Sequence, residues 1–225
     1  GVAVDATGVY TIGWEGADFR SPVGLVRKQD ARGNELWSRR FENNPISDVA
    51  VDAAGGVYVV GTGPTPTGER DIFVSKLSSQ GNPLWTRQAG LGLGSGGKVV
   101  ADNSAIYVAG TTAEGGSQHV FVRKYTAEGD VLWTARPVFA PSSFEHAFGL
   151  AANATGVYLA SSGAVEQRFA VFLRRFTTGG QELWTRRLVD RNPSRLAADA
   201  SGVYALDPSG FLRKYTLGGD EIWTR

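Results

Sequence analysis

The sequence predicts an all-β protein, a single β-propeller of five four-stranded blades (strands A-B-C-D in each repeat), with no velcro blade that shares strands from both chain ends. A dipeptide of leucine or isoleucine followed by tryptophan recurs along the chain, and its tryptophans are Trp37, Trp85, Trp133, Trp184 and Trp223. The intervals between them are 48, 48, 51 and 39 residues. Each interval contains short runs of strand-forming residues, and a period of about 40–50 residues built from such runs is typical of propeller blades.

We expect one domain over residues 1–225, with one blade for each repeat. The expected blades cover about residues 1–46, 47–96, 97–146, 147–194 and 195–225. Each repeat starts with its first strand and ends with its fourth, so five blades would close into a monomeric ring. Two alternatives stay open: a fragment of a larger ring, and a piece that completes itself by association. Methionine is absent, so Gly1 is not an initiator and we expect a processed form or an excised piece.

The second repeat shows the four expected strands, A to D, in order. They are strand A at residues 49–51, strand B at 57–60, strand C at 72–76 and strand D at 84–87. Valine, isoleucine and aromatic residues dominate these runs, while Gly, Asn and Asp separate them. That alternation of strand formers and turn formers is the pattern of successive β-hairpins.

The turns recur for physical reasons. An Asp or Asn side chain accepts the backbone N–H two residues further on and so starts a turn. Such a residue follows strand A in every repeat, at Asp5, Asp52, Asp102, Asn153 and Asp199. A glycine stands four residues ahead of each tryptophan, at Gly33, Gly81, Gly129, Gly180 and Gly219. This placement predicts a hairpin with a glycine bulge before strand D.

The recurring aromatic residues have two interpretations. In addition to the tryptophans of strand D, a tyrosine recurs in strand B, at Tyr10, Tyr58, Tyr107, Tyr158 and Tyr204. These rings either pack between blades, which would contribute roughly 2–3 kcal/mol for each buried ring, or form five ligand pockets. Their position inside strands, and not at loop tips, favours packing.

Basic residues recur in strand C, at Arg27, Lys28, Lys76, Arg123, Lys124, Arg174, Arg175, Arg213 and Lys214, and after the tryptophans, at Arg39, Arg87, Arg186 and Arg225. They are interpreted either as a five-fold anion-binding ring or as side chains whose stems cover aromatic surface. We favour the second interpretation, in which charged heads of this strand pair with acids such as Glu35, Glu182 and Glu221 on adjacent strands.

The second repeat also resembles a known family. Residues 48–87 contain Val-Ala-Val-Asp-Ala-x-Gly-x-Val-Tyr-Val-x-Gly, then Asp-x-Phe-Val-x-Lys, then Gly-Asn-x-Leu-Trp-Thr-Arg. This pattern is similar to the bacterial β-propeller repeat called SBBP. The resemblance implies a secreted or cell-surface bacterial protein, and it brings no shared catalytic residues. The fifth copy departs from the pattern at residues 204–211, where the connection between strands B and C is short.

Binding residues are expected in the connections that differ between repeats, because loops on a rigid scaffold tend to carry binding. The expected B–C loops are residues 14–22, 62–70, 111–118 and 161–168, and the expected D–A loops are 41–48, 88–98, 136–147 and 188–195. The candidate ligand-binding residues are Trp14, Phe19, Arg20, Arg70, His119, Phe139, Phe144, His146, Arg168 and Arg191. Aromatic and charged residues together are typical of binding surfaces, although such aromatics can also fold back onto a blade. Glycine alternates through residues 89–97, which we expect to be a flexible connection between blades and not a phosphate loop.

Composition and motifs exclude several classes of protein. The net charge of +1 gives no field that would attract nucleic acid. The chain contains no apolar run of about 18 residues, so we expect no membrane span. Cysteine is absent and only two histidines occur, so we expect no disulfide, no metal site and no cofactor. The expected inner strands are small and apolar and no Gly-x-Ser-x-Gly motif occurs, so we expect no enzyme, with a propeller hydrolase as a remote alternative.

The sequence therefore predicts a secreted or surface scaffold that binds other molecules through the B–C and D–A connections. The partner would be an unidentified protein or glycan. The main alternative is a lectin with sugar sites between blades. A lectin built from repeats would show similar loop residues in several copies, whereas these connections differ in every copy. That difference favours a single composite site for one partner.

Overall fold

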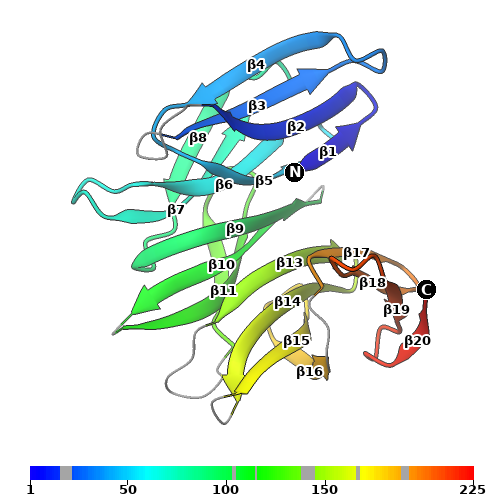
Figure 1. Ribbon diagram of the computed structural model, residues 1–225. Helices are drawn as coiled ribbons and strands as arrows, with labels where there is room; N and C mark the ends of the chain where they lie inside the picture. Colours follow the sequence, from blue (N-terminus) through cyan, green and yellow to red (C-terminus); the bar gives the residue numbers. More distant parts are fainter. Residues whose placement is uncertain (16–21, 103–104, 115, 138–144, 166–167, 189–192) are drawn as a thin grey trace. The chain divides into compact units, whose positions relative to one another are not determined.

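The computed structural model describes residues 1–15, 22–102, 105–114, 116–137, 145–165, 168–188 and 193–225. These residues form twenty strands in five four-stranded sheets, and no helix occurs among them (Figure 1). Each sheet consists of four strands that follow one another in the sequence. The predicted all-β class and the five four-stranded units are therefore confirmed.

The sheets follow the order of the repeats. The first contains β1 (Val2–Asp5), β2 (Gly8–Glu15), β3 (Val23–Gln29) and β4 (Glu35–Phe41). The second contains β5 (Ile46–Val51), β6 (Val57–Pro64), β7 (Arg70–Leu77) and β8 (Pro83–Gln88). The third contains β9 (Leu93–Ala101), β10 (Ile106–Glu114), β11 (Ser117–Tyr125) and β12 (Val131–Ala135). The fourth contains β13 (His146–Asn153), β14 (Gly156–Val165), β15 (Arg168–Phe176) and β16 (Glu182–Leu188). The fifth contains β17 (Arg195–Asp199), β18 (Gly202–Leu206), β19 (Leu212–Tyr215) and β20 (Glu221–Thr224).

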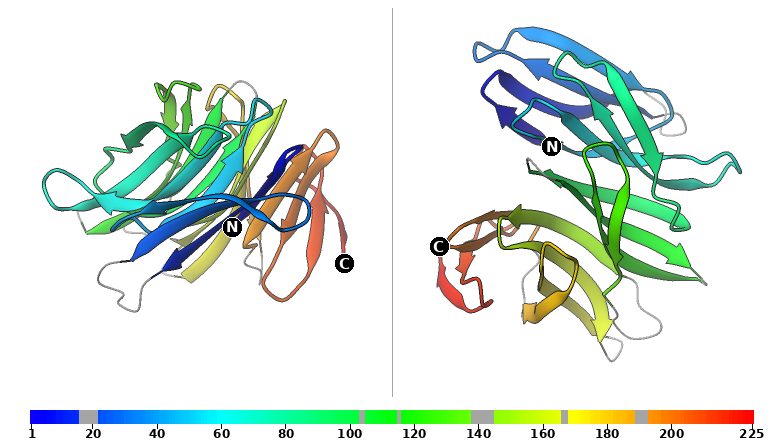
Figure 2. Two further views of the ribbon diagram at one scale, coloured as in Figure 1. Left: turned by 90° about the horizontal axis from the view of Figure 1, so that it is seen from above. Right: turned by 180° about the vertical axis from the view of Figure 1, so that it is seen from behind.

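The chain divides into two compact units. The first contains Gly1–Ile106 and Thr126–Asp130, and the second contains Tyr107–Tyr125 and Val131–Arg225. The first unit therefore holds the first two sheets, β9 and the turn before β12. The second unit holds the rest of the third sheet and the last two sheets, and Figure 2 shows the strands of each sheet from two further sides.

A carboxylate holds the turn between the first two strands in four of the five sheets, and the amide of Asn153 holds it in the fourth sheet. In the second sheet, Oδ1 of Asp52 accepts the backbone N–H groups of Ala54 at 2.9 Å and Gly56 at 2.7 Å. Its Oδ2 accepts the hydroxyl of Tyr58 at 2.8 Å. Burial, and then this hydrogen bond, raise the pKa of Tyr58, so the phenol stays protonated and remains a donor. One side chain thus closes the turn and fixes a core tyrosine.

The predicted glycine bulge is confirmed in all five sheets. Each of the five glycines has a positive φ, between 80° at Gly81 and 91° at Gly180. Each of them donates its backbone N–H to the carbonyl three residues earlier, for example Gly219 to Thr216 at 3.0 Å, while Thr216 donates to the carbonyl of Asp220 at 2.8 Å. The pairing of the last two strands then shifts by one residue directly before each tryptophan, for example between Lys214 and Tyr215. Only glycine adopts this backbone region without steric cost, which explains why it recurs ahead of each tryptophan.

The connections between the second and third strands are shorter than the sequence predicts. In the second sheet the strands continue through the expected loop, where Thr62 pairs with Ile72 and Pro64 pairs with Arg70. Residues 65–69 close the hairpin. The fourth-sheet hairpin continues in the same way from Gly156 to Phe176. The expectation of long loops was wrong there because ladder hydrogen bonds satisfy the backbone whatever the Gly, Pro and Thr content of the strands.

The glycine-rich segment expected as a flexible connection is also different. Its second half, from Leu93, is the start of strand β9. A Cβ atom on Gly97 would lie 2.6 Å from Cγ2 of Val60, and one on Gly94 would lie 3.1 Å from Cγ1 of Ile72. The glycines therefore allow β9 to approach the second sheet closely, and their reason is packing rather than flexibility. In consequence β9 begins four residues before the expected blade boundary at residue 97.

Each unit has its own apolar core. In the first unit Tyr10, Val26, Val49, Val57, Val59, Phe73 and Leu77 form one buried cluster. In the second unit Tyr158, Val171, Leu173, Val203 and Tyr215 belong to another. These clusters join residues of successive sheets, the first and second in one unit and the fourth and fifth in the other.

Candidate functional site

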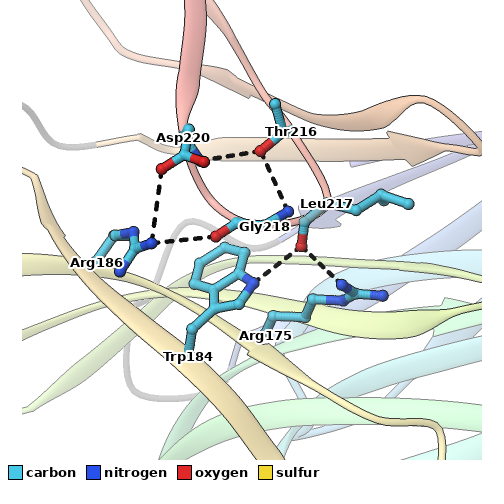
Figure 3. Close-up of polar contacts among 7 residues, drawn as sticks. All are labelled: Arg175, Trp184, Arg186, Thr216, Leu217, Gly218 and Asp220. Atoms are coloured by element: carbon cyan, nitrogen blue, oxygen red, sulfur yellow. Dashed lines mark hydrogen bonds and ion pairs between the residues drawn. The ribbon is translucent and has the colours of Figure 1, made fainter.

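The recurring tryptophan and basic residue bind the next repeat within each unit. Trp184 donates its indole N–H to the carbonyl of Leu217 at 2.9 Å, and Arg175 donates to the same oxygen at 2.7 Å (Figure 3). Leu217 lies in the turn before strand β20. We call a tryptophan and the cation that share one turn carbonyl, together with the tyrosine beneath them, a clasp.

The same clasp occurs three more times. Trp37 and Lys28 donate to Ser79 at 2.9 and 3.3 Å. Trp85 and Lys76 both donate to Ala127 at 3.1 Å. Trp133 and Lys124 donate to Thr178 at 3.0 and 3.2 Å. Each acceptor is the second residue of the turn that contains the next repeat's bulge glycine.

That glycine lies under the indole ring of the clasp. A Cβ atom on Gly180 would lie 2.7 Å from Cδ2 of Trp133, and one on Gly129 would lie 3.1 Å from Cδ2 of Trp85. The positions of Gly81 and Gly219 are equivalent. The bulge glycine is therefore required twice, for its backbone conformation and for the close approach of the ring.

The tyrosine and the cation complete the stack. The Tyr10 and Trp37 ring centroids are 6.0 Å apart, and Nζ of Lys28 lies 4.9 Å from the Tyr10 centroid. The cation is buried, so its attraction to the ring is weakly screened by water. The structure places the strand-C cations on aromatic rings, and places Arg174 at 2.8 Å from the acid Glu182. The arrangement is one of inter-blade contacts and not an open ring of charges.

Some candidate binding residues are exposed at the ends of hairpins. Trp14, on β2, is 57% exposed, and the next residue, Glu15, pairs with Arg40 at 2.6 Å. Arg168 is exposed at the start of β15. Its neighbour Phe169 is 65% exposed, although the sequence analysis did not select it. The sequence could have indicated Phe169, because it is an aromatic residue that follows the charged Arg168 beside a variable connection.

Other candidates hold the scaffold together. Arg70 donates to the carbonyls of Thr62 at 2.8 Å and Asn43 at 3.3 Å, which ties a hairpin to the preceding connection. Nδ1 of His119 lies 3.9 Å from Oε1 of Glu145, whose side chain is fully buried. Oε2 of that glutamate accepts the backbone N–H of Val120 at 2.8 Å. The carboxylate therefore anchors the chain entering the fourth sheet to strand β11.

The equivalent position in the second sheet uses a different acid for the same purpose. Asp71 is buried and accepts the backbone N–H groups of Ile72 at 2.7 Å and Gly90 at 2.6 Å. Asp71 stands where His119 stands in the third sheet. Both buried acids are engaged with backbone donors, which explains their burial without a ligand.

Of the remaining candidate binding residues, the structure describes only His146. His146 is exposed at the first position of β13. Phe19, Arg20, Phe139, Phe144 and Arg191 lie outside the described residues. Among the residues that are described, no three His, Cys, Asp or Glu side chains group together as metal ligands would.

Two cavities open at the edges of sheets. In the first unit a cavity of about 220 Å³ is lined by Phe41, Asn44, Pro64, Phe73, Thr86 and Gln88. Its two phenylalanine rings are stacked at 6.0 Å. In the second unit a cavity of about 470 Å³ combines Arg186, Arg187 and Arg213 with Asp220 and Glu221, a mixture of charges that selects neither anions nor cations.

Comparison with known proteins shows the fold. No family model matches the chain, and no curated protein matches its sequence. The WD40 β-propeller domain of Doa1 is similar in structure, with a TM-score of 0.55 and 8% identity, over 94% of this chain and 67% of that one. The N10 neuraminidase-like protein of influenza A from a little yellow-shouldered bat in Guatemala gives 0.54 at 10% identity, over 78% of this chain and 56% of that one.

BamB from Moraxella catarrhalis gives a TM-score of 0.41 at 13% identity, over 100% of this chain and 84% of that one. The matched region covers little more than half of the length of the neuraminidase-like protein. With the five four-stranded sheets, the likeness to the WD40 domain assigns the chain to the β-propeller class. Within the described ranges, no helix is long and apolar enough to cross a membrane.

Proposed function

We propose that the chain is a non-enzymatic scaffold that binds a protein partner through the ends of its B–C hairpins. The observation that carries the proposal is the exposure of large aromatic side chains at those ends, Trp14 in the first unit and Phe169 in the second. Each ring projects from a strand whose backbone is fixed by ladder pairing. A rigidly held aromatic loses little conformational entropy when it is buried by a partner.

Charged residues beside the aromatic rings support a protein partner. Arg40 lies 2.6 Å from Glu15, the residue that follows Trp14, and 3.1 Å from Glu42. Arg168 precedes Phe169. A central aromatic with a polar rim is the usual composition of a protein-protein interface.

We propose no enzymatic role, and the hydrogen bonding of the buried acids supports this part of the proposal. Asp71 and Glu145 both accept backbone N–H groups. These hydrogen bonds account for the burial of both carboxylates without a substrate. We further propose an SBBP-type bacterial surface or secreted protein, supported by the repeat pattern of residues 48–87 and by the lack of Cys and Met.

The proposal is tested by replacing the two exposed rings. We expect Trp14→Ser with Phe169→Ser to abolish capture of the partner by a photo-crosslinker placed at the neighbouring Gly13 and Arg168, with folding unchanged. The matched control replaces Leu36 and Leu132, which are comparably exposed on the outer strands β4 and β12. Equal crosslinking by the double variant and the control would overturn the proposed surface.

The lectin alternative is supported by one observation, the aromatic cavity between β4 and β7. Its volume of about 220 Å³ is below the roughly 300–1,000 Å³ usual for small-molecule sites. A glycan array separates the two functions. Signal that disappears in Asn44→Ala, which removes an amide from the cavity rim, would favour the lectin, and no signal would favour the scaffold.

A further inference from the structure

One arginine of the fifth repeat is buried without a matching hydrogen-bond partner. Arg213, on β19, is 6% exposed. Its Nη2 atom is enclosed and has no hydrogen-bond acceptor among the described residues. The acid with which it pairs, Asp207, places Oδ2 at 3.9 Å, which is beyond hydrogen-bond distance. Burying a guanidinium without a hydrogen bond is costly, so this group indicates a missing acceptor.

The equivalent arginine of the fourth repeat has such an acceptor. Arg174 stands ten residues before the recurring tryptophan of its repeat, as Arg213 does, and it donates to Oε1 of Glu182 at 2.8 Å. Glu221 is the corresponding acid of the fifth repeat, but it accepts the hydroxyl of Thr224 and forms no ion pair with Arg213 in the part of the chain that the structure describes. The fifth repeat therefore has the arginine and the acid without the bond between them.

Arg213 lines the cavity of about 470 Å³ in the second unit. The hairpin beside it is short, because Leu206 and Leu212 form the last pair of β18 and β19. In the fourth repeat the equivalent hairpin continues for several more pairs, to Val165 and Arg168. The fifth sheet therefore ends beside a residue that lines the cavity. The volume falls within the roughly 300–1,000 Å³ that is usual for small-molecule sites.

The net charge of the cavity wall selects neither sign, but its charged residues differ in what they already contact. Arg186 lies 3.7 Å from Asp220, so these two charges offset each other (Figure 3). Arg187 and Glu221 are exposed, so water solvates them. Among the described residues of the wall, Arg213 is the buried charge, and its donor is unfilled.

We propose that this cavity binds a small organic acid, a monocarboxylate with an apolar body. Its carboxylate accepts hydrogen bonds from the guanidinium of Arg213, because the planar donors of arginine match the two carboxylate oxygens. Its apolar body lies against Leu188 and Tyr215, which are buried apolar residues of the same wall. Asp220 and Glu221, at the exposed part of the wall, repel anions that carry more than one charge, such as a phosphate dianion.

The test is titration calorimetry of the intact chain with phenylacetate and with hexanoate, two monocarboxylates that differ in their apolar body. We expect saturable binding of at least one of them, with one site in each chain. The amide of the same acid keeps its shape and lacks its charge, so we expect its dissociation constant to be at least about tenfold higher. No binding of either acid at millimolar concentration, equal affinity for the amide, or tighter binding of phenyl phosphate would each overturn the proposal.

A matched pair of arginine variants separates the proposed contact from a general attraction to the cavity wall. Arg213→Met removes the buried guanidinium and keeps an unbranched side chain, and we expect the affinity for the acid to fall at least about tenfold. Arg187→Met is the control, because Arg187 lines the same cavity but is exposed. Equal losses in the two variants would contradict the proposal. If Arg213→Met fails to fold, Arg213→Lys keeps the charge and removes the planar fork, with the same expected direction.

Stability measurements provide a second readout of the same site. A ligand that binds only the folded chain raises the urea concentration at the midpoint of unfolding. We expect the bound acid to raise this midpoint for the unaltered chain and for Arg187→Met, and to leave it unchanged for Arg213→Met. An equal increase in Arg213→Met would mean that the acid binds elsewhere, which overturns the proposal.

An acidic side chain of a protein carries the same carboxylate, and competition distinguishes the two sources. The competitor is a short peptide with one glutamate between glycines and with both ends blocked. Displacement of the acid by an equal or lower concentration of this peptide would assign the cavity to a protein partner and overturn the proposal, whereas weaker or no displacement supports it.

This site is separate from the surface of the proposed function. Neither Trp14 nor Phe169 lines the cavity. We expect Trp14→Ser with Phe169→Ser to bind the acid with unchanged affinity, so this test and the test of the proposed function fail independently.

Discussion

A single acidic side chain sets the first turn of most repeats, and its charge state has a measurable consequence. Oδ1 of Asp199 accepts the backbone N–H of Ser201 at 2.7 Å and its hydroxyl at 2.7 Å, while Oδ2 accepts from Tyr204 at 3.0 Å. The hydrogen bonds from Ser201, followed by the one from Tyr204, lower the pKa of Asp199 from 3.8 to about 2. A carboxylate with a lowered pKa contributes stability above its unfolded pKa, and this is lost as the pH falls through the folded value.

We therefore predict that Asp199→Asn flattens the dependence of unfolding free energy on pH between about 4 and 2. The variant should lose stability mainly near neutral pH, where the ionised carboxylate contributes, and the loss should shrink as the pH falls towards 2. The backbone bond remains, because an amide oxygen can accept the N–H of Ser201. Asn153 already does so, accepting the N–H of Thr155 at 2.9 Å. Urea unfolding at several pH values measures the effect. The reciprocal variant Asn153→Asp should steepen the same dependence, and an unchanged slope in both variants would contradict the assignment.

At the scale of one element, β9 shows that glycine content alone does not define a loop. Its glycines remove side chains where the strand approaches Val60 and Ile72. The exposed face of the same strand contains Gly96, at which an added Cβ would meet nothing within 4 Å. The adjacent Gly96 and Gly97 thus serve different purposes. Gly97 allows the close contact with Val60, and Gly96 adopts a backbone φ of 60°.

We predict that Gly97→Ala destabilises the first unit by about 1–3 kcal/mol, because its methyl group overlaps a buried valine. Gly96→Ala is the control, which pays only for its backbone conformation, about 1 kcal/mol. Adding Val60→Ala to Gly97→Ala should recover part of the loss, so the two changes should be non-additive in a double-mutant cycle. Equal effects of Gly97→Ala and Gly96→Ala in denaturant unfolding would remove the packing explanation.

At the scale of the whole molecule, stability depends on each repeat receiving the turn of the next. The turn of the fifth repeat fills the clasp of Trp184, and Val203 and Tyr215 pack in one cluster with Tyr158 and Leu173. Repeats that contact only their neighbours lose stability when an end repeat is removed. The fifth repeat therefore covers the fourth.

We predict that a chain ending at residue 194 unfolds at a lower urea concentration and binds more of a hydrophobic dye. Removing residues 195–225 uncovers the fully buried ring of Tyr158 and leaves the Trp184 N–H without its acceptor. Dye fluorescence and the urea concentration at the midpoint of unfolding are measured together. Exposed apolar surface should raise the dye fluorescence, and the loss of packing should lower the midpoint. An unchanged midpoint would show that the repeats are stable independently.

Much of the fold could be predicted because it is local. The glycine before Trp85 and the aspartate at position 52 each act within a few residues, so their spacing predicted the bulge and the turn. The site was less predictable. Arg70 and Trp14 looked alike as charged or aromatic residues near variable connections, yet Arg70 binds two backbone carbonyls and Trp14 is exposed. Which of them is held by backbone carbonyls depends on strand length and on neighbouring chain segments.

The sequence by itself determined the class of protein, the number of repeats and the strand order, because turns, bulges and alternation are set by residues close together in the chain. The tertiary structure alone decided what the recurring tryptophans bind, since each acceptor lies 33–45 residues away in another sheet. It also decided that β9 is a strand. The physical reason is the same in each case: burial and hydrogen bonding between distant segments depend on which surfaces meet, and a local pattern does not contain that information.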